Sequence, residues 1–64
     1  MDESYRGYTI RISCGAIWHA VLVEAATGVV LPTKATARLR EGHIVALKRA
    51  QELVDVYCRA LETA

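Results

Sequence analysis

Residues 8–13 alternate between apolar and polar side chains, and this is the first regular pattern along the chain. A period of two, carried by aromatic and β-branched residues, is typical of a strand with one buried face. Gly15 then interrupts the alternation inside a short turn, so we expect the strand to end there. The apolar positions are Tyr8, Ile10 and Ile12, and the polar positions are Thr9, Arg11 and Ser13.

Residues 17–25 form a second run that is apolar at both parities, with His19 and Glu24 as its exceptions. A strand that is covered on both faces has this composition. We therefore expect this run to be the central strand of a sheet. The residues that follow it include Gly28, which can adopt the positive φ that a tight turn requires.

A third run covers residues 29–40 and alternates cleanly after Pro32. Proline has no amide hydrogen to donate to a β-ladder, so it belongs on an edge strand or at a bulge. The third strand of a meander is an edge strand, which agrees with the position of Pro32. The first strand is then expected to have the other free edge.

From about Glu41 the apolar residues recur every three or four positions, which is the spacing of an amphipathic helix. The helix start is weakly marked, because no capping residue stands just before the stripe and Gly42 is a poor helix former. We place the start near residue 41, with Gly42 at the junction. The alternative is a helix that begins at Ala37 and is capped by Thr36. The stripe consists of Ile44, Leu47, Ala50, Val54, Tyr57, Cys58 and Leu61.

These elements predict an α+β fold, in which a three-stranded antiparallel β-meander is followed by one long C-terminal α-helix packed on one face of the sheet. Residues 1–4 are expected to be a disordered tail, and residues 5–64 a single β-β-β-α domain. Trp18 is expected to anchor the core by packing on the helix near Ala50 and Val54. The sheet residues expected to face the helix are Tyr8, Ile10, Ile12, Trp18, Ala20, Leu22, Val29, Leu31, Ala35, Ala37 and Leu39.

A domain of 64 residues has little interior, yet 53% of its residues are hydrophobic. Domains this small often need a disulfide framework, a metal ion or a second subunit to be stable. Cys14 and Cys58 are far apart in the chain, and the histidines His19 and His43 are isolated, so neither a disulfide framework nor a zinc site is expected. We therefore expect free thiols, no cofactor, and self-association.

The first four residues are acidic and polar, unlike a secretory signal peptide. The apolar stretch over residues 20–26 is too short to span a bilayer and contains Glu24. We expect a cytoplasmic protein that does not associate with membranes. The formal net charge of +1 does not point to a class of partner.

A three-stranded sheet with one helix has a second face that nothing in the chain can cover. By the parities above, this face has an apolar centre and a polar or basic rim, which is how protein interfaces are built. The sequence thus predicts a homodimer formed through this face, and the same face suits another protein partner. The predicted interface residues are Ile17, His19, Val21, Val23 and Val30.

A basic strip on the sheet offers the alternative function, a nucleic-acid-binding module of antitoxin-like or regulatory type. Phosphate binding needs a cluster of this kind. Single-strand binders also interleave aromatic residues for base stacking, and this face has none. The acidic residues, seven in number, nearly balance the eight basic ones. The residues of the strip are Arg11, Lys34, Arg38 and Arg40.

The sequence shows no motif for catalysis. The four glycines are scattered singly, so there is no phosphate-binding loop. Cys14 and His19 could be considered as a thiol and a base, but such a pair needs hydrogen-bond reach and an orienting third group. No third group is evident near either residue. We predict that the protein is not an enzyme.

Residues 5–10 read Tyr-Arg-Gly-Tyr-Thr-Ile, residues 18–20 read Trp-His-Ala, and the helix carries Ala46, Ala50 and residues 53–55, Leu-Val-Asp. This order resembles small bacterial domains of unknown function built as β-β-β-α, which open with a Tyr-x-Gly-Tyr-x-Ile strand and carry a Trp-x-Ala second strand. The resemblance covers most of the chain after residue 4. It implies this fold and a bacterial source, and it implies no activity.

The architecture is also similar to that of HicB-type antitoxins, which use a three-stranded sheet and a helix. Those proteins have acidic, glycine-containing turns in the sheet, and this chain has none. It also shows no separate DNA-binding segment. Both departures argue against an antitoxin role, and similarity of fold is in any case a poor guide to function.

Overall fold

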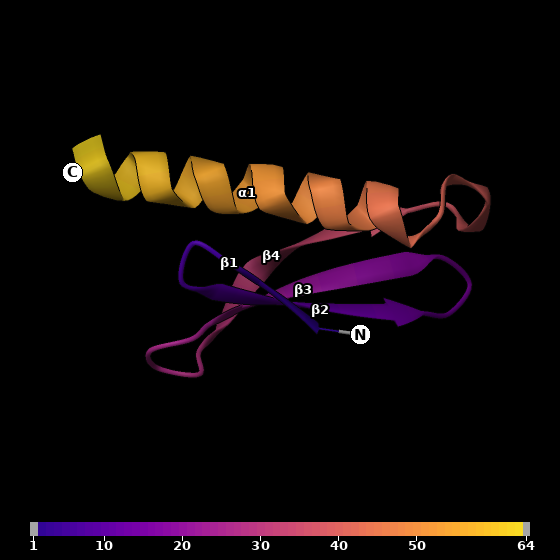
Figure 1. Cartoon of the computed structure of the whole chain (residues 1–64), viewed down its shortest axis with the longest axis horizontal. Coiled ribbons are helices and arrows are strands. Elements are labelled where there is room, and N and C mark those ends of the chain that lie inside the picture. Colours follow the sequence, from indigo (N-terminus) through magenta and orange to yellow (C-terminus); the bar gives the residue numbers. More distant parts are fainter. Residues whose placement is uncertain (1, 64) are drawn as a thin grey trace.

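The computed structural model describes residues 2–63, which form one antiparallel sheet with a long helix across one of its faces (Figure 1). The strands are β1 (Asp2–Tyr5), β2 (Tyr8–Cys14), β3 (Trp18–Glu24) and β4 (Val30–Ala37). A short 3₁₀ turn, η1 (Leu39–Glu41), leads into the helix α1 (His43–Thr63). The predicted α+β class and the packing of a C-terminal helix on the sheet are therefore confirmed, while the sheet has four strands rather than three.

The additional strand is β1, which occupies the segment predicted to be a disordered tail. It pairs antiparallel with β2, from Asp2 opposite Arg11 to Tyr5 opposite Tyr8. The two-residue turn between the strands has positive φ at both positions, 48° at Arg6 and 86° at Gly7. This is the geometry of a type I′ hairpin, whose twist matches that of the paired strands. The prediction for residues 2–4 was wrong because their polar side chains gave no alternating pattern. Met1 lies outside the described residues.

The strand order in the sheet is β1-β2-β3-β4. β3 is an inner strand, as predicted from its apolar composition, and β4 is an edge strand, as predicted from Pro32. β4 also bulges at this point, because Val21 pairs with Lys34 whereas Val23 pairs with Val30. The free edge expected on the first predicted strand, now β2, is instead covered by β1.

The sheet and the helix are joined by a tight junction. β4 ends at Ala37, three residues earlier than predicted, and α1 begins at His43. Gly42 lies between them with φ 85° and ψ 167°, a conformation that is almost restricted to glycine. The prediction of Gly42 as the junction is confirmed. The alternative helix start at Ala37 with a Thr36 cap was wrong, because Thr36 lies within β4.

The core between sheet and helix is narrow and rich in alanine. On α1, the fully buried residues Ala46, Ala50 and Val54 follow one another at intervals of four. Small side chains at these positions let the helix approach the sheet closely. The buried residues of the sheet are Tyr8, Ile10, Ile12, Ala20, Leu22, Ala35 and Ala37.

Several residues predicted for the core are exposed. Val29 precedes β4 and Leu39 lies in η1, and their exposed fractions are 57% and 52%. On the helix, Ile44 and Leu61 were assigned to the buried stripe but are 62% and 69% exposed. Both lie near the ends of α1. The buried stripe is therefore shorter than the hydrophobic pattern predicted.

Trp18 is half-buried at the N-terminal end of α1 rather than fully enclosed in the middle of the core. Its ring centroid lies 5.7 Å from that of His43. Its Nε1 donates a hydrogen bond of 3.4 Å to the carbonyl oxygen of Leu39 in η1. The tryptophan thus connects the start of β3 to the junction that precedes the helix.

Polar contacts attach the opposite part of the sheet to the helix. The carboxylate of Asp55 accepts hydrogen bonds from the Tyr5 hydroxyl at 2.9 Å and from Arg6 Nη1 at 2.8 Å. These bonds, first that from Arg6, hold the pKa of Asp55 below its ordinary value. The Tyr57 hydroxyl and Thr33 Oγ1 form a further hydrogen bond of 2.9 Å. The β1–β2 turn and β4 are each tied to α1 in this way.

Candidate functional site

The face of the sheet opposite α1 is the first candidate site, and no element between residues 2 and 63 covers it (Figure 1). The strand register aligns the residues of this face in three rows that run across the strands, and we call each row a rung. Paired residues in an antiparallel sheet point to the same side. We call this surface the open face. Its residues are Asp2, Ser4, Thr9, Arg11, Ser13, His19, Val21, Val23, Val30, Lys34 and Thr36.

The centre of the open face is apolar. Val21 and Val23 of β3 are half-buried by their neighbours, and Val30 of β4 is 59% exposed. With His19, these are four of the five residues that the sequence predicted for a dimer interface. The fifth, Ile17, precedes β3 and lines a pocket at the end of the sheet. The structure therefore groups four of the predicted residues and separates the fifth.

His19 carries an unsatisfied polar atom. Its Nδ1 is buried, yet it has no hydrogen-bond partner among the described residues. Ser13 and Thr36 lie opposite it on the two neighbouring strands. A buried polar atom without a partner costs about 1–3 kcal/mol. Within the described residues, His19 Nδ1 is therefore a buried polar atom without compensation.

The open face carries opposite charges at its two edges. Asp2 and Arg11 form a long ion pair of 4.0 Å between β1 and β2, with both side chains more than half exposed. Lys34 lies on β4, at the other edge of the sheet. Exposed ion pairs contribute little to stability, so this pair adds little to the pairing of β1 with β2. One edge is acidic and the other basic.

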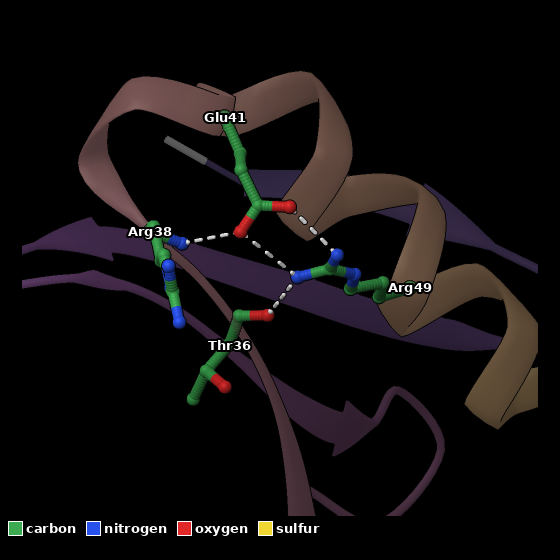
Figure 2. A network of polar contacts seen from close by, with 4 residues as sticks. All are labelled: Thr36, Arg38, Glu41 and Arg49. Atoms are coloured by element: carbon green, nitrogen blue, oxygen red, sulfur yellow. Dashed lines mark hydrogen bonds and ion pairs between the residues drawn. The ribbon is translucent and has the colours of Figure 1, made fainter.

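A second candidate site is a pocket of about 710 Å³ where β4 leads into η1. We call it the end pocket. Its wall includes a network built around Arg49 and Glu41 (Figure 2). The pocket is lined by Ile17, Thr36, Ala37, Arg38, Arg40, Glu41 and Arg49.

Arg49 connects the three segments that form the end pocket. It donates to both carboxylate oxygens of Glu41, at 2.7 and 3.4 Å, and to the carbonyl oxygen of Thr36 at 3.0 Å. Glu41 also accepts a hydrogen bond of 2.9 Å from the backbone N–H of Arg38. The Arg38 bond and then the Arg49 bonds lower the pKa of Glu41. The sequence did not single out Arg49, because its spacing from Glu41 and Thr36 has meaning only once the junction is folded.

The four residues of the predicted basic strip form two groups. Arg11 and Lys34 flank Val21 on one rung of the open face. Arg38 and Arg40 lie beyond the end of β4 and line the end pocket. Arg11 faces Asp2, whereas no ion pair joins Arg38 or Arg40 to any described carboxylate. Arg11 and Lys34 therefore belong to the open face, whereas Arg38 and Arg40 belong to the end pocket.

A groove of about 440 Å³ runs beside the free edge of β4, between this strand and α1. Its wall is partly apolar, with Leu53 and Val56 from the helix, and Thr36 and Arg49 line both this groove and the end pocket. Val56 is 57% exposed. Lys34 and Thr36 of the open face also line this groove, so it borders the rim of that face.

The histidines and cysteines do not assemble into a reactive centre among residues 2–63. Cys14 pairs with Trp18 on the helix side of the sheet, whereas His19 lies on the open face. Cys14 and Cys58 are both free thiols. No cluster of histidine, cysteine, aspartate or glutamate side chains suited to a metal ion is found in this part of the chain. Nor does any described helix have the length and apolar character needed to cross a membrane.

Comparison of the chain with family models, with curated proteins and with solved structures gives no match. The similarity to β-β-β-α bacterial domains therefore rests on the strand and helix motifs alone.

Proposed function

We propose that this protein is a non-enzymatic, cytoplasmic interaction module that self-associates through the open face of its sheet. The observation that carries the proposal is the valine cluster, Val21, Val23 and Val30, which lies opposite the helix with none of the described elements over it. Sheets with one uncovered apolar face are commonly completed by a second layer. A second copy of the chain supplies such a layer with the same polar and apolar pattern.

The area required is moderate for a molecule of this size. Stable interfaces remove about 800 Å² from each partner, roughly a fifth of the 4274 Å² that this chain exposes. Complete burial of a valine contributes at most about 1.5–3 kcal/mol, and Val21 and Val23 are already half-buried. Association itself costs several kcal/mol. The valines therefore need support from the charged rim.

The rim charges are arranged to give that support. A two-fold axis parallel to the strands would place β1 of one copy over β4 of the other, because the strand order is β1-β2-β3-β4. Asp2 and Lys34 lie on the same rung, so each Asp2 would meet the Lys34 of its partner. Both contacts form at once because a two-fold interface is self-complementary. Opposite charges at the edges then set the orientation of the two sheets.

The experiment that tests the proposal compares two aspartate variants by light scattering on a sizing column. Val21→Asp places a carboxylate at the centre of the open face, and we expect it to give a folded monomer. Ile44→Asp places the same charge at an exposed position near the start of α1 that lines neither the groove beside β4 nor the end pocket, and we expect it to keep the dimer mass. Circular dichroism checks that both variants retain the helix. A folded Val21→Asp variant with the dimer mass would remove the open face as the interface.

A further inference from the structure

The arginines of this protein differ in whether they have a counter-ion. Arg6 pairs with Asp55 at 2.8 Å, Arg11 with Asp2 at 4.0 Å, and Arg49 with Glu41 at 2.7 Å. Arg38 and Arg40 have no carboxylate partner among the described residues, although both line the end pocket. Figure 2 shows the Arg38 side chain directed away from the Glu41 carboxylate, which its backbone N–H contacts instead.

The one carboxylate of the end pocket is already engaged. Both oxygens of Glu41 accept hydrogen bonds from Arg49, and one also accepts the N–H of Arg38. Glu41 therefore neutralises Arg49 and fixes its position, and it leaves the charges of Arg38 and Arg40 uncompensated. Three guanidinium groups and one carboxylate give the pocket an excess of two positive charges.

We propose that the end pocket binds a phosphate group, held by the guanidinium groups of Arg38 and Arg40. Guanidinium donates two parallel N–H groups that match the oxygens of phosphate, and such charge-assisted bonds are among the strongest in proteins. The pocket volume of about 710 Å³ lies within the range of ligand sites. Ile17 adds an apolar wall on which the rest of a phosphorylated molecule can lie.

The phosphate group can belong to a mononucleotide-like small molecule or to a nucleic-acid strand, and both offer the same chemistry to the two arginines. A strand contacts several cations at once, so its binding weakens steeply with salt. A single phosphate monoester in a pocket depends less on salt, because it engages only the local charges. Salt dependence therefore separates the two sources.

Trp18 provides a direct reporter for this site. Its indole Nε1 donates to the carbonyl of Leu39, the residue between Arg38 and Arg40. Trp18 is the only tryptophan of the chain, so its indole N–H gives a single, assignable resonance in ¹⁵N spectra. A ligand that draws in the two arginines will shift η1 and this hydrogen bond with it.

The test is an NMR titration of the uniformly ¹⁵N-labelled protein with three probes: inorganic phosphate, adenosine 5′-monophosphate, and a single-stranded oligothymidylate. We expect saturable shifts of the Trp18 indole and of the amides of residues 38–42. The Arg38→Ala/Arg40→Ala variant should bind about tenfold more weakly per arginine removed. The control variant Lys48→Ala/Arg59→Ala loses the same charge at exposed helix positions outside the pocket and should bind as the unaltered protein does.

Saturable binding of adenosine monophosphate that changes little with salt would assign the site to small phosphorylated molecules. Binding of the oligothymidylate alone, lost steeply with salt, would assign it to nucleic acid. The proposal is overturned if none of the probes shifts the indole saturably, or if both double variants weaken binding equally. The monomeric Val21→Asp variant should keep phosphate binding, which makes this test independent of the proposed dimer.

Discussion

Asp2 and Lys34 lie at opposite ends of one rung of the sheet, with Arg11 and Val21 between them. This rung places a negative charge at one edge of the open face and a positive charge at the other. It becomes visible only when the N-terminal segment is recognised as a strand. The relationship gives the open face a polarity that a second copy can match in one orientation.

Reversal of one charge at this rung is expected to weaken the dimer. In Lys34→Glu, the new carboxylate would face Asp2 of the partner at two places, and like charges across an interface are costly. We expect a dimer that dissociates at roughly tenfold higher concentration, measured by sedimentation equilibrium. Lys34→Glu combined with Asp2→Lys restores opposite charges and should restore the affinity. No recovery in the double variant would contradict the two-fold arrangement.

Close approach of helix and sheet at Ala50 makes this position sensitive to size. Ala50 is fully buried, so Ala50→Leu inserts atoms for which there is no space. We expect the free energy of unfolding to fall by about 1–3 kcal/mol, measured by urea denaturation. The exposed Ala60 of the same helix is the matched control, and Ala60→Leu should change stability by less than about 0.5 kcal/mol.

The junction before α1 depends on glycine at position 42. With φ 85° and ψ 167°, any side chain strains the backbone, although a Cβ there meets no atom within 4 Å. We expect Gly42→Ala to lower the free energy of unfolding by about 1–3 kcal/mol. Gly15 has equally open surroundings without a positive φ. Equal stability losses in Gly15→Ala and Gly42→Ala would show that conformational strain is not the cause.

Acid should destabilise the protein through Asp55 and Glu41. Hydrogen bonds from Arg6 and Tyr5 lower the pKa of Asp55, and bonds from Arg38 and Arg49 lower that of Glu41. A lowered pKa in the folded state stabilises the protein above the ordinary carboxyl pKa of about 4, and this stabilisation is lost as the pH falls through the folded value. We expect the urea midpoint to fall over this range, and Asp55→Asn to make the fall shallower. An unchanged pH profile in Asp55→Asn would exclude its role.

The sequence was most informative where side-chain pattern and backbone geometry coincide. The alternation in β2, the inner position of β3 and the edge position of β4 with Pro32 all followed from local rules and are confirmed. β1 did not follow, because its residues are polar and its position depends on pairing with β2. The signal available was Gly7 between Tyr5 and Tyr8, which is compatible with a two-residue hairpin.

The sites were predictable only in part, for a similar reason. The alternation of side chains along a strand was enough to predict that His19, Val21 and Val23 share one face of the sheet. The end pocket forms where η1 connects β4 to α1. No local sequence pattern indicates that Arg49 contacts Glu41 and Thr36. The prediction treated residues 38–40 as a continuation of the third strand, which would have put Arg38 and Arg40 on one strip with Arg11. In the structure the chain turns into η1 after β4, and this turn separates Arg38 and Arg40 from Arg11.

If a second copy covers the open face, the unaltered protein has the mass of a dimer in solution. We would measure the mass by light scattering on a sizing column at a low and a high salt concentration. We expect a dimer at both, with weaker association at high salt because the rim charges are screened while the valine contacts persist. A monomer at both salt concentrations would contradict it.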